Sequence, residues 1–201
     1  MSEQEQALRA MAQSNAFLLL KQAAVHLGVW VLAFCLFAAS DSWSQLTGWT
    51  LAGVLNVLTG FLAGFATVNL VHEWFHYFGA RAGASSYSLN ARPGLFIYDW
   101  NFDENSLRQF YLMSIAGTVG GFIAVLLVYM SVEADSAGRA ALIGGAVASF
   151  ALGALVEWPV LARTRRSRDP LAELSKLTPR VLGLAAAGSA IAGLLTWAVL
   201  M

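Results

Sequence analysis

Five apolar stretches, each long enough to cross a bilayer, constrain this chain more than any other feature. They run over residues 17–39, 51–82, 108–132, 138–162 and 179–201. A membrane-spanning helix needs about 20 apolar residues. Only 12% of the residues are charged, whereas a soluble domain carries about 25%. The sequence therefore predicts one all-α polytopic membrane domain over residues 1–201, with five transmembrane helices in contact with the lipid bilayer.

The longest polar connection, residues 83–107, separates the second span from the third. Within it, Tyr87–Ala91 and Leu95–Trp100 are rich in aromatic and alternating residues, as short strands are, and Pro93–Gly94 between them is typical of a turn. We therefore expect a short β-hairpin between the second and third transmembrane helices.

Lys and Arg residues near the membrane ends predict the orientation of the chain, because cytoplasmic connections are enriched in them. The connection over residues 163–178 is strongly basic, whereas those around residues 40–47 and 133–138 carry almost no Lys or Arg. We therefore expect the N-terminus and the hairpin to lie in the cytoplasm and the C-terminus outside, with the inner or plasma membrane as the default location. A formal net charge of zero argues against a nucleic-acid partner.

The sequence His72-Glu73-Trp74-Phe75-His76 lies inside the second span. Histidines four residues apart share one helix face, so both imidazoles can bind the same Zn²⁺ ion. Glu73 lies beside them and can act as the general base that takes a proton from zinc-activated water. Ionisable residues are costly in a membrane and usually functional there. The competing interpretation places these side chains at the interface, with no metal.

A catalytic zinc site needs a third protein ligand and one open position. Glu157 is the preferred candidate, because it lies as far from the cytoplasmic end of the fourth span as His76 lies from that end of the second, at a rise of about 1.5 Å per residue. The alternative for Glu157 is an interfacial carboxylate paired with Arg163 or Arg165 of the following connection. His26 and Asp169 are the other candidate ligands, although His26 is more typical of a buried packing residue. The predicted metal-site core covers residues 51–165.

The segments VNLVHEWFHYFGARAG and MSIAGTVGGFIAVLL resemble the site-2 protease family of intramembrane zinc metalloproteases and related small zincin-type membrane peptidases. The resemblance covers about residues 65–165. It implies that His72 and His76 bind zinc and that Glu73 is the catalytic base. The family's Ala-Gly pair is present as Ala116-Gly117. Thr118 stands where the family has proline, and Gly121 stands where it often has asparagine. The family's Leu-Asp-Gly motif, which supplies its acidic ligand, is not present, so the assignment of Glu157 rests on depth.

These features predict an intramembrane zinc metalloprotease that hydrolyses peptide bonds of membrane-anchored protein substrates near the cytoplasmic face. The first alternative is a non-catalytic membrane scaffold or partner protein that keeps the metalloprotease fold, although a purely structural site does not need Glu73. The second alternative is a transporter that uses the same side chains as a proton relay. No pair of broken helices in repeated halves is evident, so the transporter is the weaker of the two.

Overall fold

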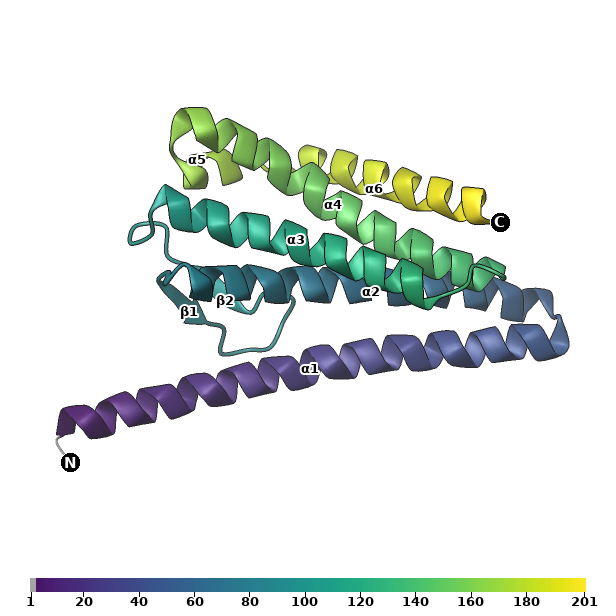
Figure 1. Cartoon of the computed structure of the whole chain (residues 1–201), viewed down its shortest axis with the longest axis horizontal. Coiled ribbons are helices and arrows are strands. Elements are labelled where there is room, and N and C mark those ends of the chain that lie inside the picture. The colour runs from purple at the N-terminus through teal and green to yellow at the C-terminus, as the bar shows by residue number, and fades with distance from the viewer. Residues whose placement is uncertain (1–2) are drawn as a thin grey trace.

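The computed structural model describes residues 3–201, and this range contains six α-helices and two short β-strands (Figure 1). The helices are α1 (Glu3–Thr47), α2 (Thr50–Ala82), α3 (Leu107–Ser131), α4 (Ala137–Ser167), α5 (Pro170–Leu174) and α6 (Pro179–Leu200), and the strands are β1 (Tyr87–Leu89) and β2 (Tyr98–Trp100). Within the described range, all helices except α5 are long and apolar enough to cross a membrane. The chain is therefore a multi-pass membrane protein, and the predicted fold class is confirmed.

The first connection differs from the sequence prediction, because residues 40–47 are helical. α1 continues to Thr47 and ends at Gly48, which has a φ of +64° and donates its N–H to Ser44 O at 2.9 Å. Polar groups in this last part of α1 have partners inside the bundle: the amide of Asn56 on α2 donates to the Asp41 carboxylate at 3.0 Å. A polar stretch whose side chains are satisfied this way does not need to leave the helix.

α2 lies at the centre of the bundle and packs against α1, α3 and α4, while α6 packs on α4 (Figure 1). Glycines bring α2 and α4 close together. A side chain at Gly64 would collide with the backbone of Leu142, and one at Gly145 would collide with the backbone of Phe61. Small residues of this kind let two helix backbones approach within a membrane. The two helices are therefore held in one axial register.

The hairpin lies at the end of the bundle where α2 ends and α3 begins. β1 and β2 are antiparallel, with Tyr87 opposite Trp100. Both strands are shorter than predicted, because residues 90–97 form an irregular loop that extends towards α1 (Figure 1). The rings of Tyr87 and Tyr98 pack on Tyr77 of α2, with centroids 5.7 and 6.1 Å away. These aromatic contacts fix the hairpin against the helix that carries the histidine motif.

Candidate metal centre

His72 and His76 lie one turn apart on the face of α2 that is turned into the bundle. Their Nε2 atoms are 2.9 Å apart, and their rings meet edge to face with centroids 4.4 Å apart. Their side chains are 11% and 12% exposed. The helix spacing therefore directs both imidazoles to one point, as the sequence predicts.

Glu157 of α4 reaches the same point from the opposite side. Its Oε1 atom lies 2.7 Å from His72 Nε2 and 3.1 Å from His76 Nε2. Arg163, one of the two arginines considered as partners for Glu157, instead pairs with Glu173, at 3.0 Å from Nε to Oε2. α4 continues without interruption past Pro159. The structure thus brings the three residues predicted as ligands together.

The ring of His76 is fixed in orientation by α3. Its Nδ1 atom is 2.9 Å from the carbonyl oxygen of Met113. A carbonyl only accepts hydrogen bonds, so Nδ1 carries the hydrogen and Nε2 turns its lone pair towards His72 and Glu157. Gly117, also on α3, faces the ring so closely that an added Cβ would lie 2.6 Å from Nδ1. The space for the imidazole depends on this glycine.

The three side chains fit a divalent metal ion. Two histidine nitrogens and one glutamate oxygen form a set typical of catalytic zinc, whose tetrahedral ligand atoms lie about 3.3 Å apart when each bond is about 2.0–2.1 Å. The observed separations of 2.7, 2.9 and 3.1 Å need to widen by only a few tenths of an ångström. The second carboxylate oxygen, Glu157 Oε2, is buried without a hydrogen-bond partner among residues 3–201. A bound cation would stabilise that oxygen.

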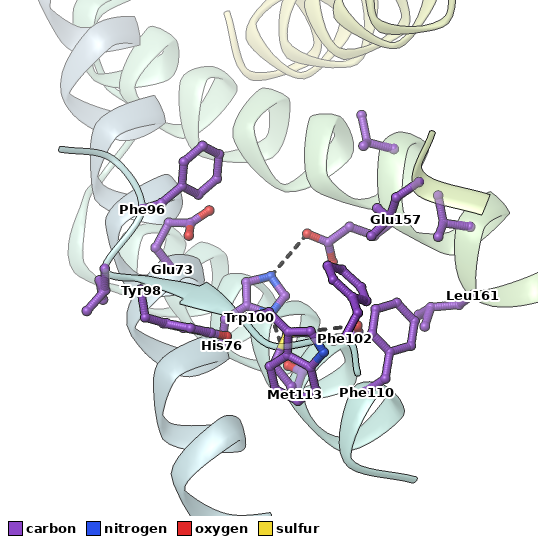
Figure 2. Close-up of a pocket in the computed structure, with 15 residues that line it drawn as sticks. Glu73, His76, Phe96, Tyr98, Trp100, Phe102, Phe110, Met113, Glu157 and Leu161 are labelled. Atoms are coloured by element: carbon purple, nitrogen blue, oxygen red, sulfur yellow. Dashed lines mark hydrogen bonds and ion pairs between the residues drawn. The ribbon is translucent and has the colours of Figure 1, made fainter. Parts of the chain in front are cut away.

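A cavity of about 260 Å³ opens beside the three side chains. Glu73, His76 and Glu157 point into it from α2 and α4, and aromatic residues of the hairpin segment also line it (Figure 2). Within residues 3–201 the Glu73 carboxylate makes no hydrogen bond or ion pair. It is thus free to act on a molecule in the cavity. Leu174 of α5 also lines this space, so the short helix that the sequence did not predict closes part of it.

The other candidate ligands lie outside the cluster. His26 of α1 is buried and hydrogen-bonded to Trp74 and to the loop between the strands, in agreement with a packing role. Asp169 accepts a hydrogen bond from Ala172 N at 3.0 Å and caps α5. Among the described residues, His72, His76 and Glu157 form the group with metal-ligand spacing.

Gly153 was not identified from the sequence as a residue that shapes the centre, and Tyr98 was considered only as part of the predicted hairpin. Gly153 of α4 faces His72, and an added Cβ there would lie 3.2 Å from Cε1 of the ring. Tyr98, from β2, lines the cavity, and burial raises its pKa above the ordinary value. Gly117 of the third span lies opposite His76, and Gly153 of the fourth span lies opposite His72. The small-residue patterns of these two spans are the sequence signal that contains both positions.

No family model, no curated protein and no solved structure matches this chain.

Proposed function

We propose that this protein is an intramembrane zinc metalloprotease that hydrolyses peptide bonds of membrane-anchored proteins. The observation that carries the proposal is the convergence of His72, His76 and Glu157 at one edge of a cavity. The carboxylate of Glu73, which has no partner within the described residues 3–201, is turned into the same cavity. Two histidines, an acidic ligand and an adjacent general base are the elements of zinc-dependent peptide hydrolysis. A scaffold would not need the free carboxylate.

The chain's own groups supply the remaining steps. A zinc ion held by the three ligands would provide the positive charge that acidifies water and polarises a peptide carbonyl. Glu73 takes the proton of the attacking water on its carboxylate and later delivers it to the nitrogen of the leaving amine. The Met113 carbonyl keeps the His76 ring in place during both transfers. Apolar side chains around the cavity exclude bulk water, which strengthens the electrostatic interactions inside.

The substrate is proposed to be a membrane-spanning segment that unwinds locally. The cavity lies within the helices that cross the membrane, close to the end that carries the hairpin and the basic connection between α4 and α6. Arg and Lys enrichment supports a cytoplasmic position for that end. An unwound segment has exposed peptide groups, and β2 lies beside the cavity with Tyr98 and Trp100 in its wall.

The test uses purified protein in detergent and a fluorophore–quencher peptide that contains one apolar membrane-spanning segment. We expect about one zinc ion per chain by mass spectrometry, and a His72→Ala/His76→Ala double variant should lose it. Glu73→Gln should keep the zinc and lose about two or more orders of magnitude in rate, because the base is removed while the ligands remain.

The comparison between metal content and rate separates the protease from the scaffold. A Glu73→Gln variant that hydrolyses the peptide as fast as the parent protein would show that Glu73 is not the base. A parent protein that binds zinc but hydrolyses neither this peptide nor membrane proteins of the host would favour the non-catalytic alternative.

A further inference from the structure

Two polar side chains of α1 are buried in the membrane-spanning part of the chain without contacting the metal ligands. Gln22 is 3% exposed and His26 is 5% exposed. A polar group buried in an apolar environment costs free energy unless its hydrogen bonds are satisfied. The partners of these two residues therefore indicate what their presence in α1 achieves.

Both side chains bind the backbone of Gly94, in the loop between β1 and β2. The Gly94 N–H donates to Gln22 Oε1 at 3.3 Å, and Gln22 Nε2 donates to the Gly94 carbonyl oxygen. His26 Nε2 lies 2.8 Å from the same carbonyl oxygen. Gly94 is 68 residues or more from both side chains in the sequence, so these bonds fasten a distant loop to α1.

The second nitrogen of His26 connects this loop to α2. Trp74 Nε1–H donates to His26 Nδ1 at 3.0 Å. An indole nitrogen only donates, so Nδ1 accepts and the hydrogen of the neutral imidazole is on Nε2, where it is donated to Gly94 O. Trp74 directly follows Glu73. A continuous series of hydrogen bonds thus runs from the loop, through α1, to the residue next to the proposed base.

The fastened loop carries part of the cavity wall. Phe96 and Ile97 line the cavity together with Glu73 and His76. At the base of the loop, Asn90 N–H donates to the Ile97 carbonyl at 3.1 Å, and Asn90 Nδ2 donates to the Phe96 carbonyl at 3.0 Å. The loop is therefore held by its own hydrogen bonds at Asn90 and by the side chains of α1 at Gly94. Phe96 and Ile97, the two wall residues, lie between Gly94 and β2.

We propose that Gln22 and His26 are positioning residues that hold the loop of residues 90–97 as the substrate-facing wall of the metal cavity. The inference rests on the proposed protease function. Neither side chain touches the metal ligands or Glu73; they act through the Gly94 peptide and the Trp74 indole. Losing them should displace the wall that an unwound apolar substrate segment contacts, and should leave the zinc ligands in place.

The first arm of the test is kinetic and uses Gln22→Leu, His26→Leu and His26→Gln in the full-length protein with the quenched transmembrane peptide. We expect the leucine variants to raise KM by about tenfold, as for the loss of a buried hydrogen bond, with kcat and zinc content close to those of the parent. His26→Gln should recover much of the loss, because an amide N–H can still reach Gly94 O. If leucine at position 26 prevents folding, the other two variants are sufficient.

Trp30→Phe is the control, because it removes another side-chain hydrogen bond of α1, from Trp30 Nε1 to Thr67 Oγ1 of α2 at 3.0 Å, without touching the loop. KM should be unchanged in this variant. An equal rise of KM in Trp30→Phe and Gln22→Leu would mean that α1 acts only through general helix packing. Unchanged KM in both leucine variants, or a loss of zinc from them, would also overturn the proposal.

The second arm does not depend on activity. Backbone amides of residues 90–97 should exchange hydrogen for deuterium at least about tenfold faster in Gln22→Leu than in the parent or Trp30→Phe, because the Gly94 N–H loses its acceptor. Unchanged exchange refutes the anchoring itself, whatever the kinetics. Faster exchange in a protein whose parent hydrolyses no peptide would refute the proposed function, and the substrate role with it, while leaving the anchor established.

Discussion

Replacement of Gly117 by alanine tests the centre through a residue that binds nothing itself. A Cβ at this position would lie 2.6 Å from Nδ1 of His76 and still closer to two other ring atoms, whereas ordinary contacts begin near 3.4 Å. Because two ring atoms would lie closer still, the imidazole must retreat by more than about 0.8 Å, against a tolerance of about 0.2 Å for a metal–ligand distance. Retreat would also stretch the hydrogen bond from Nδ1 to the Met113 carbonyl.

The expected magnitude follows from the cost of overpacking a well-packed interior, about 1–3 kcal/mol for an added methyl or methylene group. Without metal the ring can relieve the strain by moving, whereas with metal it must occupy the strained position. Most of the cost should therefore appear as weaker zinc binding, which corresponds to a loss of affinity of about 5- to 150-fold.

The assay is zinc affinity by competition with a chelating dye, measured together with the thermal unfolding midpoint in detergent. Gly120→Ala is the matched control, because its Cβ would lie 2.6 Å from Cδ2 of Phe75 rather than against a ligand. Gly183→Ala, where no atom lies within 4 Å of the added Cβ, controls for the substitution itself. We expect both clashing variants to lower the midpoint and only Gly117→Ala to lose zinc affinity strongly. Parental zinc affinity in a folded Gly117→Ala protein would refute the assignment of His76 as a ligand in this geometry.

Two further predictions concern the acidic ligand and the orientation. Glu157→Ala should lower zinc occupancy far more than Asp169→Ala, because Asp169 only caps α5. Glu157→Asp should have an intermediate occupancy, since its carboxylate oxygen is drawn back by about 1 Å from a site that tolerates little displacement. Equal occupancy in the two alanine variants would exclude Glu157 as a ligand. In a Cys35→Ser background, the single variants Ser85→Cys and Ser167→Cys should not react with a membrane-impermeant maleimide added to intact cells. Rapid labelling of either variant would show that the predicted orientation is wrong.

Features set by local periodicity could be predicted from the sequence. The five spans follow from apolar stretches alone, and His72 and His76 share a face because of the helix repeat. Glu157 could be matched to them because two nearly straight helices that cross the same membrane convert distance along the sequence into depth. The role of each of these residues in catalysis remains a prediction.

Features that depend on contacts between distant backbones could not be predicted. The binding of the Gly94 peptide by Gln22 and His26 depends on the path of an irregular loop, which has no periodic signal. The helical continuation of α1 through Asp41 depends on partners supplied by α2 and α4. From the sequence, Gly117 could be identified only as part of the Ala-Gly pair of the family it resembles. Its contact with His76 depends on how α3 packs on α2, which the sequence does not show.

The glycine contacts between α2 and α4 have a consequence for how the length of these helices can vary in evolution. Gly64 and Gly145 fix the two backbones against each other, and the proposed ligands follow further along the same helices. One residue inserted between Gly145 and Glu157 would rotate the carboxylate by about 100° and advance it by about 1.5 Å, which would turn it away from the histidines. Insertions and deletions should therefore be confined to the connections, and the intervals from Gly64 to His72 and from Gly145 to Glu157 should stay constant in homologous chains that keep the metal.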